Sequence, residues 1–411
     1  MRKQIKIIAA VCGIVMLSLL TAGLLLADRI PDRFSVIEGQ ELTFENRYPI
    51  VAVSANQPQS MEVSGTLKAG EQYKTDLKLF GVVEVKNVSV KVVKEARVVP
   101  CGYAFGVKLH TEGVVVVGLS DVDTKDGSEN PSYAAGIRMG DIILAINGKT
   151  VNSNKEVSEI FNQSDGKPMK ITLRRGNVGF EVKMTPVKSV SQNQYKTGMW
   201  VRDSTAGIGT ITFTVPSTGL FAGLGHGICD VDTGEILPLM TADIVKVDIS
   251  GIARGNKGQP GELEGKLHDE TWGSLYSNTQ TGVFGILNNS SASKAIPVAM
   301  RQQVHEGPAK ILATLDKSGP KEYSISIEKV HFNDAAPTKN MIVRITDSSL
   351  IAKAGGIVQG MSGCPIIQDG KLVGAITHVF VNDPLRGYGI FAENMIDTAG
   401  QINNSFLKQA S

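Results

Sequence analysis

The chain has 411 residues, with 42 Lys or Arg against 40 Asp or Glu, so its formal net charge at pH 7 is only +2. That length is enough for two or three domains, each with its own core. Charges this evenly balanced exclude the basic surface typical of nucleic-acid-binding proteins, and we expect no nucleic-acid partner. The 44 glycines and the short runs rich in Val and Ile predict many short strands and tight turns, so we expect a mainly β protein of several domains.

Residues 1–27 predict a signal or anchor segment. Three basic residues within the first six positions precede an uncharged apolar run from Ile7 to Ala27. A run of this length can cross a bilayer core of about 30 Å, and the positive-inside rule then places the rest of the chain outside the cytoplasm. No clean Ala-x-Ala cleavage signal is present. We expect a secreted or membrane-anchored protein, and both retention and cleavage of the segment remain open.

Two less specific segments come next. Residues 28–60 are polar, contain proline and have little periodicity, and we interpret them as a stalk. Residues 61–100 alternate apolar and polar side chains, most regularly from Leu79 to Val93, which predicts a small β-rich segment.

Residues 101–187 contain a more specific pattern. Strand-like runs precede a short helix that begins at Pro131 and ends at Gly136, and Asn147-Gly148 predicts a two-residue hairpin turn. Ser153 can cap an amphipathic helix that follows. Over its whole length this stretch resembles a PDZ domain.

The PDZ resemblance implies a peptide-binding loop at the start of this stretch. The loop is formed by Gly102, Tyr103, Ala104, Phe105 and Gly106. Successive backbone N–H groups in such a loop can capture a C-terminal carboxylate, and the bound peptide then adds as a strand to the sheet edge. We therefore expect a peptide or protein C-terminus as a partner.

A polar connector at residues 189–194 leads to a long, glycine-punctuated, strand-rich region at 197–411. Within it, the run Gly360-Met361-Ser362-Gly363-Cys364-Pro365 is suited to a nucleophile. A serine hydroxyl needs a base and N–H groups aimed at the developing oxyanion, and glycines let the chain turn tightly around the substrate. The N–H groups of Gly360 and Ser362 are the candidates for the oxyanion hole.

A predicted β-hairpin follows this motif, with its turn at Asp369-Gly370. A nucleophile loop followed by such a hairpin resembles trypsin-like peptidases, which implies a double β-barrel domain. The comparable motif there is Gly-Asp-Ser-Gly-Gly-Pro. This chain differs at Met361 and Cys364.

The base that activates the serine must come from the six histidines. Glycines flank His226 in Gly225-His226-Gly227 at the end of an apolar segment, which leaves its imidazole accessible on a defined turn. His378, after the predicted hairpin strand, is the second candidate. A carboxylate should orient the imidazole. Asp347, Asp243 and Asp248 are possible, and spacing alone does not choose between them.

The assembled order of motifs resembles the stage IV sporulation protein B (SpoIVB) serine peptidase family. An N-terminal segment, a β-rich segment and a PDZ domain precede the run from Trp200 to Thr210, then Leu224-Gly225-His226-Gly227-Ile228 and the Ser362 motif. The resemblance implies a catalytic triad of His226, Asp347 and Ser362. It also implies a sporulation peptidase in the space between forespore and mother-cell membranes. There it would cleave a membrane-associated regulator, so that an intramembrane metalloprotease processes a sigma factor.

Two alternatives remain: a non-catalytic PDZ scaffold, and a general envelope quality-control protease. Proteases of the second kind place the PDZ domain after the protease, the reverse of the order here. We expect no cofactor and no metal, because the adjacent residues His268, Asp269 and Glu270 cannot converge on one ion. Cys229 and Cys364 could form a disulfide, but free buried thiols are favoured.

Overall fold

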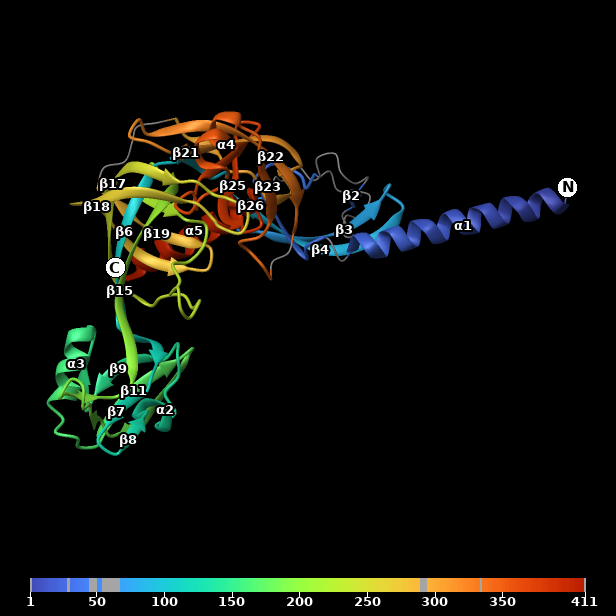
Figure 1. Ribbon diagram of the computed structural model, residues 1–411. Coiled ribbons are helices and arrows are strands. Elements are labelled where there is room, and N and C mark those ends of the chain that lie inside the picture. Colours follow the sequence, from blue (N-terminus) through green and yellow to red (C-terminus); the bar gives the residue numbers. More distant parts are fainter. Residues whose placement is uncertain are drawn as a thin grey trace.

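The computed structural model describes residues 2–27, 30–43, 50–53, 67–288, 294–332 and 335–409. The N-terminal segment forms helix α1 (Arg2–Ala27), which projects away from the rest of the chain (Figure 1). Over the described residues, no helix combines the length and the apolar character that a membrane span requires. The expected membrane segment therefore stays a prediction.

A small four-stranded sheet follows α1, in the order β1-β4-β3-β2. Its strands are β1 (Arg33–Ile37), β2 (Ile50–Val53), β3 (Gln72–Leu79) and β4 (Val83–Val93). Alternate residues of β4 are buried, as the sequence pattern predicts, and they pack with Phe34 and Leu77. Strand β1 pairs in parallel with β4, so this part of the expected stalk belongs to the sheet. Residues 44–49 and 54–66 lie outside the described residues.

The first of two β-barrels is a ring closed by the pairing of β15 with β6. In ring order its strands are β6 (Ala104–Leu119), β17 (Leu239–Ala253), β18 (Glu262–Thr279), β19 (Gly282–Leu287), β16 (Leu220–Gly223) and β15 (Met199–Thr214). Two short strands, β5 (Arg97–Pro100) and β20 (Ile296–Pro297), extend it. Because β5 and the first half of β6 belong here, the barrel region begins about a hundred residues before the expected start at 197.

The second barrel is closed in the order β21-β22-β23-β26-β25-β24. Its strands are β21 (Gly307–Thr314), β22 (Pro320–Val330), β23 (Met341–Ile345), β24 (Pro365–Gln368), β25 (Lys371–Phe380) and β26 (Asp383–Phe391). Asp369 and Gly370 both have positive φ between β24 and β25, which confirms the predicted tight hairpin. Helices α4 (Ser348–Ala354) and α5 (Ala392–Gln409) and the 3-10 turn η1 (Arg301–Gln303) complete this half.

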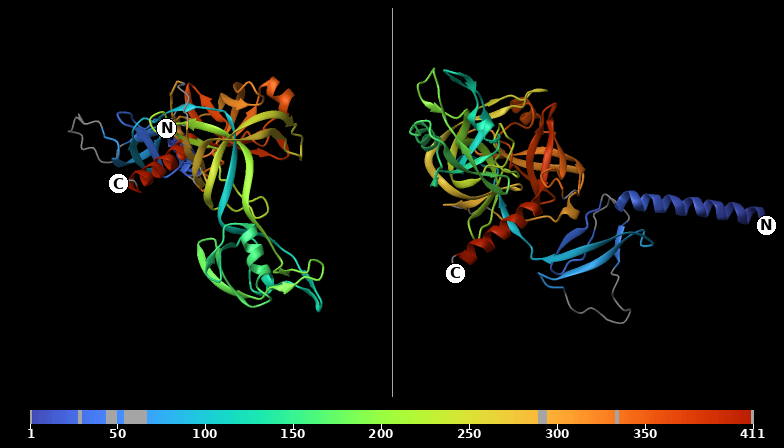
Figure 2. Two further views of the ribbon diagram at one scale, coloured as in Figure 1. Left: turned by 90° about the vertical axis from the view of Figure 1, so that its left-hand side faces the viewer. Right: turned by 90° about the horizontal axis from the view of Figure 1, so that it is seen from below.

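The PDZ unit is inserted into the first barrel. The two long paired strands β6 and β15 connect it to the barrel (Figure 2, left). Its main elements are α2 (Pro131–Ala134), α3 (Asn154–Asn162), β9 (Ile142–Ile146), β11 (Met169–Arg175) and β12 (Val178–Met184). The unit also contains the short strands β7 (Val122–Thr124), β8 (Gly127–Glu129), β10 (Lys149–Thr150), β13 (Val187–Lys188) and β14 (Tyr195–Lys196). The predicted local signals are present, including a capping box between Ser153 and Glu156 at the start of α3.

The predicted peptide-binding loop at residues 102–106 lies elsewhere, at the start of β6 in the first barrel. Phe105 is fully buried in the barrel core. Strand β15 pairs with this part of β6 on one side and β17 pairs with it on the other. A strand hydrogen-bonded on both sides has no edge for a peptide, so this prediction is wrong. Instead, a pocket of about 360 Å³ lies between α3 and residues Met199–Val201 of β15.

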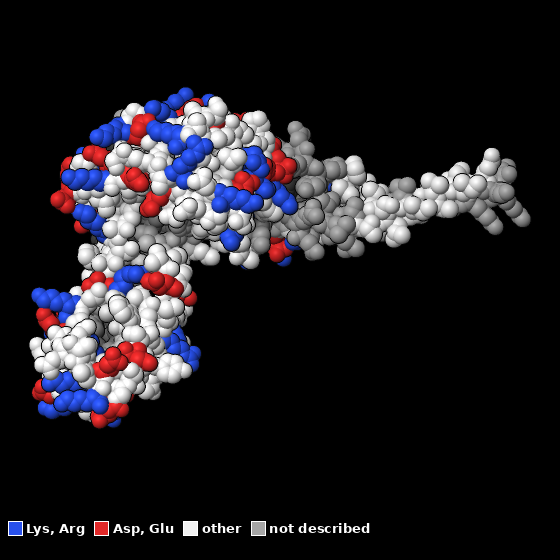
Figure 3. All heavy atoms as spheres, in the orientation of Figure 1, with Lys and Arg blue, Asp and Glu red and all other residues white. Residues whose placement is uncertain are grey.

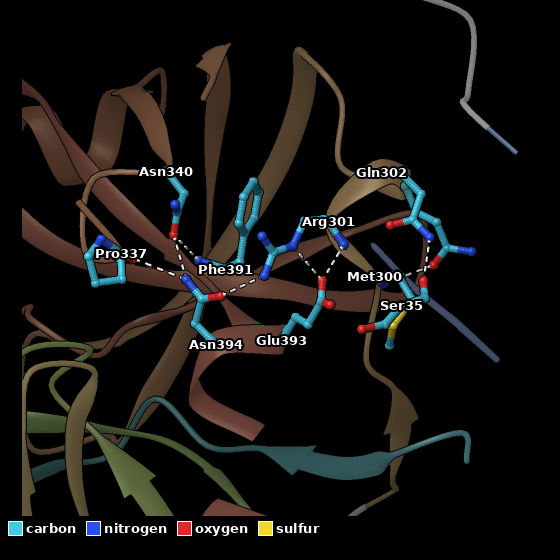
Figure 4. Close-up of polar contacts among 10 residues, drawn as sticks. Ser35, Met300, Arg301, Gln302, Pro337, Asn340, Phe391, Glu393 and Asn394 are labelled. Carbon is cyan, nitrogen blue, oxygen red and sulfur yellow. Dashed lines mark hydrogen bonds and ion pairs between the residues drawn. The ribbon is translucent and has the colours of Figure 1, made fainter. Parts of the chain in front are cut away.

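A buried polar network joins α5 to the second barrel (Figure 4). The side chains of Arg301 and Glu393 are 10% and 5% exposed, and the backbone N–H and Nε of Arg301 both donate to Glu393 Oε2, at 2.9 and 3.1 Å. Arg301 Nη2 donates to Asn394 Oδ1 at 3.2 Å. Next to it, Gln302 Nε2 donates to the Ser35 carbonyl at 2.7 Å and so ties the small sheet to the barrel. On the face shown in Figure 3, acidic and basic side chains are interspersed, in keeping with the balanced composition.

Candidate active site

Ser362 lies in the loop between α4 and β24. Gly355 ends α4 in the left-handed conformation, and the chain then reaches Ser362 through Gly360 and leaves it through Gly363, both at φ +95°. A side chain at Gly363 would place its Cβ 2.0 Å from the carbonyl oxygen of Thr210. Both the backbone conformation and the lack of space therefore require glycine around Ser362.

Two N–H groups of this loop are available to an oxyanion. Within the described part of the chain, no hydrogen bond of the structure uses the N–H of Gly360 or of Ser362. The carbonyl of each preceding residue is held, since Leu263 N–H donates to Gln359 O at 2.9 Å and Cys364 N–H donates to Met361 O at 3.0 Å. Because a peptide unit is planar, fixing the carbonyl also fixes the direction of the N–H that follows. The predicted pair of donors is thus preorganised.

His226 lies on a tight turn just after β16. Leu224 and Gly225 both have positive φ, and the Gly225 N–H donates to Gly223 O at 2.8 Å. His226 Nδ1 lies 2.8 Å from the Gly227 carbonyl oxygen. If Nδ1 carries the proton and donates it there, Nε2 is left as an acceptor, the form that a general base needs. Burial lowers the pKa of His226, which keeps the imidazole neutral.

Ser362, His226 and His378 line one pocket of about 540 Å³. The Ser362 hydroxyl donates to the Thr377 carbonyl at 2.7 Å. The rings of His226 and His378 are 4.7 Å apart between centroids and are tilted by 32°. Desolvation, with the neighbouring His226 and Lys339, lowers the pKa of His378 to about 4. The first and second histidine candidates thus lie side by side in the pocket that Ser362 also lines.

The structure does not bring Asp347 to His226. Asp347 is the N-cap of α4, where its carboxylate accepts hydrogen bonds from the N–H groups of Ser349 and Leu350 at 3.0 and 3.1 Å. These bonds, with the Ser349 hydroxyl as the largest contribution, lower the pKa of Asp347. The carboxylate that the family resemblance pairs with the His226 imidazole is thus hydrogen-bonded to the N-terminus of α4 instead.

Neither alternative carboxylate is in contact with His226 in the structure. Asp243 lies on β17 opposite Ser274 of β18. Asp248 pairs with His268 at 3.0 Å on the same two strands. Among the described contacts, the polar partner of the His226 ring is therefore the Gly227 carbonyl rather than a carboxylate.

The described cysteines are all free: Cys101 and Cys364 are buried and Cys229 is exposed. The expected free thiols are thus present, although Cys229 is not buried. Burial raises the pKa of Cys364 to about 12, so this thiol beside the nucleophile loop stays protonated. In the described residues, no three His, Cys, Asp or Glu side chains are grouped to hold a metal ion.

Residues 193–396, which include Ser362 and His226, match the SpoIVB peptidase S55 family. The chain belongs to this serine peptidase family. Residues 128–175 match the PDZ domain family and fall within the inserted unit. The resemblance drawn from the sequence motifs is therefore confirmed for this SpoIVB-family protein.

Curated relatives match the SpoIVB-family chain over short stretches. Serine protease HTRA1 of Xenopus laevis is 40% identical over 58 residues, which cover 14% of this chain and 12% of that protein. A probable periplasmic serine endoprotease DegP-like of Brucella suis is 30% identical over 110 residues, covering 25% of this chain and 21% of that protein. The chain thus spans about an eighth to a fifth of these relatives. A solved PDZ domain of an SdrC-like protein from Listeria monocytogenes is 21% identical, covers 22% of this chain and 87% of its own, and has a TM-score of 0.19.

Sequence reasoning missed the residues that hold the Ser362 loop in place. Leu263 and Thr210 contact it from strands of the first barrel, about a hundred or more positions earlier in the chain. Thr210 ends the run from Trp200 that contributes to the family resemblance, but nothing in that run indicates a contact with Ser362, and Leu263 belongs to no recognised motif. Only the pairing of the barrel strands brings these residues to the Ser362 loop, and that pairing would have to be known before their role could be predicted.

Proposed function

We propose that this SpoIVB-family chain is a serine endopeptidase in which Ser362 is the nucleophile and His226 the general base. The observation that carries the proposal is one pocket lined by His226, Gly360 and Ser362, in which the two loop N–H groups have no hydrogen-bond partner among the described residues. A nucleophile, a base and two preorganised donors are the parts that acyl transfer requires.

In the first step, the Ser362 hydroxyl leaves the Thr377 carbonyl and turns its proton toward His226 Nε2. Oγ then attacks the carbonyl carbon of the peptide as its proton passes to Nε2, and the Gly360 and Ser362 N–H groups stabilise the oxyanion. Imidazolium next protonates the leaving amine, and the C–N bond breaks to give an acyl-enzyme. A water molecule, deprotonated by the same imidazole, releases the acid and restores Ser362. Throughout, the Gly227 carbonyl holds the Nδ1–H.

The proposed substrate is a membrane-associated regulatory protein of sporulation. Its cleavage between the forespore and mother-cell membranes would trigger an intramembrane metalloprotease and sigma-factor processing. Family membership supports this role, and the basic residues and apolar run at the N-terminus support a secreted or membrane-anchored location. The PDZ unit supports capture of a peptide partner, for which the pocket between α3 and β15 is the proposed place.

A fluorophosphonate probe tests the enzymatic proposal. We expect purified full-length protein to be labelled and to hydrolyse a peptide substrate, and we expect both properties to be lost in Ser362→Ala. Failure of the wild-type protein to react would favour the non-catalytic scaffold. For the substrate, co-expression with a candidate membrane regulator should give a cut whose position mass spectrometry can map, and the cut should be absent with Ser362→Ala.

A further inference from the structure

Thr210 and Thr212 are buried polar residues of the first barrel that point to the nucleophile loop. Their exposed fractions are 1% and 0%. The Thr210 hydroxyl donates to the Gly360 carbonyl at 2.8 Å, and the Thr212 hydroxyl donates to the Gly363 carbonyl, also at 2.8 Å. One strand therefore holds the loop on both sides of Ser362.

The backbone of Thr210 adds two further contacts. Its N–H donates to the Ser362 carbonyl at 2.9 Å. Its carbonyl accepts from the Leu224 N–H at 3.2 Å, two residues before His226. Thr210 thus touches the loop of the nucleophile and the turn of the base at once, and these two segments belong to different barrels.

The hydroxyl of Thr210 holds a carbonyl that lies next to one of the proposed oxyanion donors. Gly360 is one of the two proposed oxyanion donors, and its carbonyl is the group that Thr210 holds. Without that donor, the buried Gly360 carbonyl loses its partner. The peptide unit between Gly360 and Met361 then keeps the bond from the Met361 N–H to Val358 O at 3.1 Å, and glycine at φ +95° offers little resistance to a shift of this unit. That peptide unit lies between the two that carry the donors, so a shift there would change how the Gly360 and Ser362 N–H groups are placed around the oxyanion.

We propose that Thr210 is a positioning residue for catalysis, which fixes the Ser362 loop against the His226 turn, with Thr212 as a second hold on that loop. The inference rests on the proposed peptidase function. It assigns to β15 the alignment of nucleophile, oxyanion donors and base.

Thr210→Val tests the role, because valine keeps the branched shape and removes only the hydroxyl. Purified full-length protein is compared by kcat and KM on a peptide substrate, by the rate of fluorophosphonate labelling, and by Tm. We expect kcat and the labelling rate to fall about 10- to 100-fold, the scale of a small misalignment, with KM within about threefold of wild type. Thr210→Ser, which restores the hydroxyl, should recover both to within about threefold.

Thr111→Val is the matched control. Thr111 is equally buried on β6, and its hydroxyl donates to the Gly113 carbonyl at 2.7 Å, away from the pocket. We expect this variant to lose Tm as Thr210→Val does and to keep wild-type kcat. Equal kcat in Thr210→Val and wild type, or an equal loss in the control, would overturn the inference. An unreactive wild-type protein would instead overturn the peptidase proposal itself.

Discussion

Asp347→Asn separates helix capping from a triad role at one position. In the structure the carboxylate caps α4 through two N–H groups at 3.0 and 3.1 Å and also accepts from Ser324 N–H at 3.3 Å. Asparagine caps helices about as well as aspartate, so the free energy of unfolding should change by less than about 1 kcal/mol. Because Gly227 holds Nδ1 of His226, we expect kcat to stay within about tenfold of wild type, far from the loss of a triad carboxylate.

Peptide hydrolysis and denaturant unfolding measure the two effects separately. Asp347→Ala removes the cap and should lower the free energy of unfolding by about 1 kcal/mol, which sets the scale for the structural role. A fall in kcat of about 10⁴ in Asp347→Asn, with normal stability, would refute this reasoning. It would place Asp347 in the triad that the family resemblance implies.

Two ion pairs and the titration of His226 give further predictions. Arg202→Ala leaves Asp230, whose side chain is 0% exposed, without its cation. We expect the free energy of unfolding, measured by urea titration, to fall by about 2 kcal/mol, a value reduced because Arg202 is 30% exposed; no change would contradict the pairing. Arg301→Met should lower the free energy of unfolding by about 3–5 kcal/mol, because it leaves the buried Glu393 carboxylate without its cation. Glu393→Gln keeps an acceptor and should lower it by less than Arg301→Met does; the reverse order would count against the network. Burial lowers the pKa of His226, and only the neutral imidazole can accept a proton. As the pH is lowered, kcat/KM should therefore stay constant until the pH falls below about 6.5, the ordinary pKa of histidine. A loss of kcat/KM that begins at or above this pH would be inconsistent with a buried base.

Local signals in the sequence predicted local structure well. The hairpin at Asp369-Gly370 and the capped helix at Ser153 depend on neighbours in the chain, and both are present. The pairing of Ser362 with His226 in one pocket also followed from their glycine-framed motifs. The hairpin and the capped helix need only short-range chemistry, whereas the meeting of Ser362 and His226 also depends on how the two barrels pack.

Long-range pairing accounts for the differences. The glycines of the 102–106 segment suggested a loop, yet β15 and β17 recruit it into the first barrel from both sides. The PDZ unit is an insertion because β6 and β15 run through both units, which no local pattern records. Asp347 has the short side chain and position of a helix cap, and local hydrogen bonds there compete with any contact across the barrel.

The most direct test of the central claim is the site of covalent labelling. Full-length protein is treated with a fluorophosphonate, digested, and mapped by tandem mass spectrometry, with His226→Ala treated in parallel. We predict a single adduct on Ser362 that forms rapidly in wild type and at least about 10²-fold more slowly in His226→Ala, because general-base assistance is lost. An adduct on another residue, or equal rates in the two proteins, would contradict the assignment of Ser362 and His226.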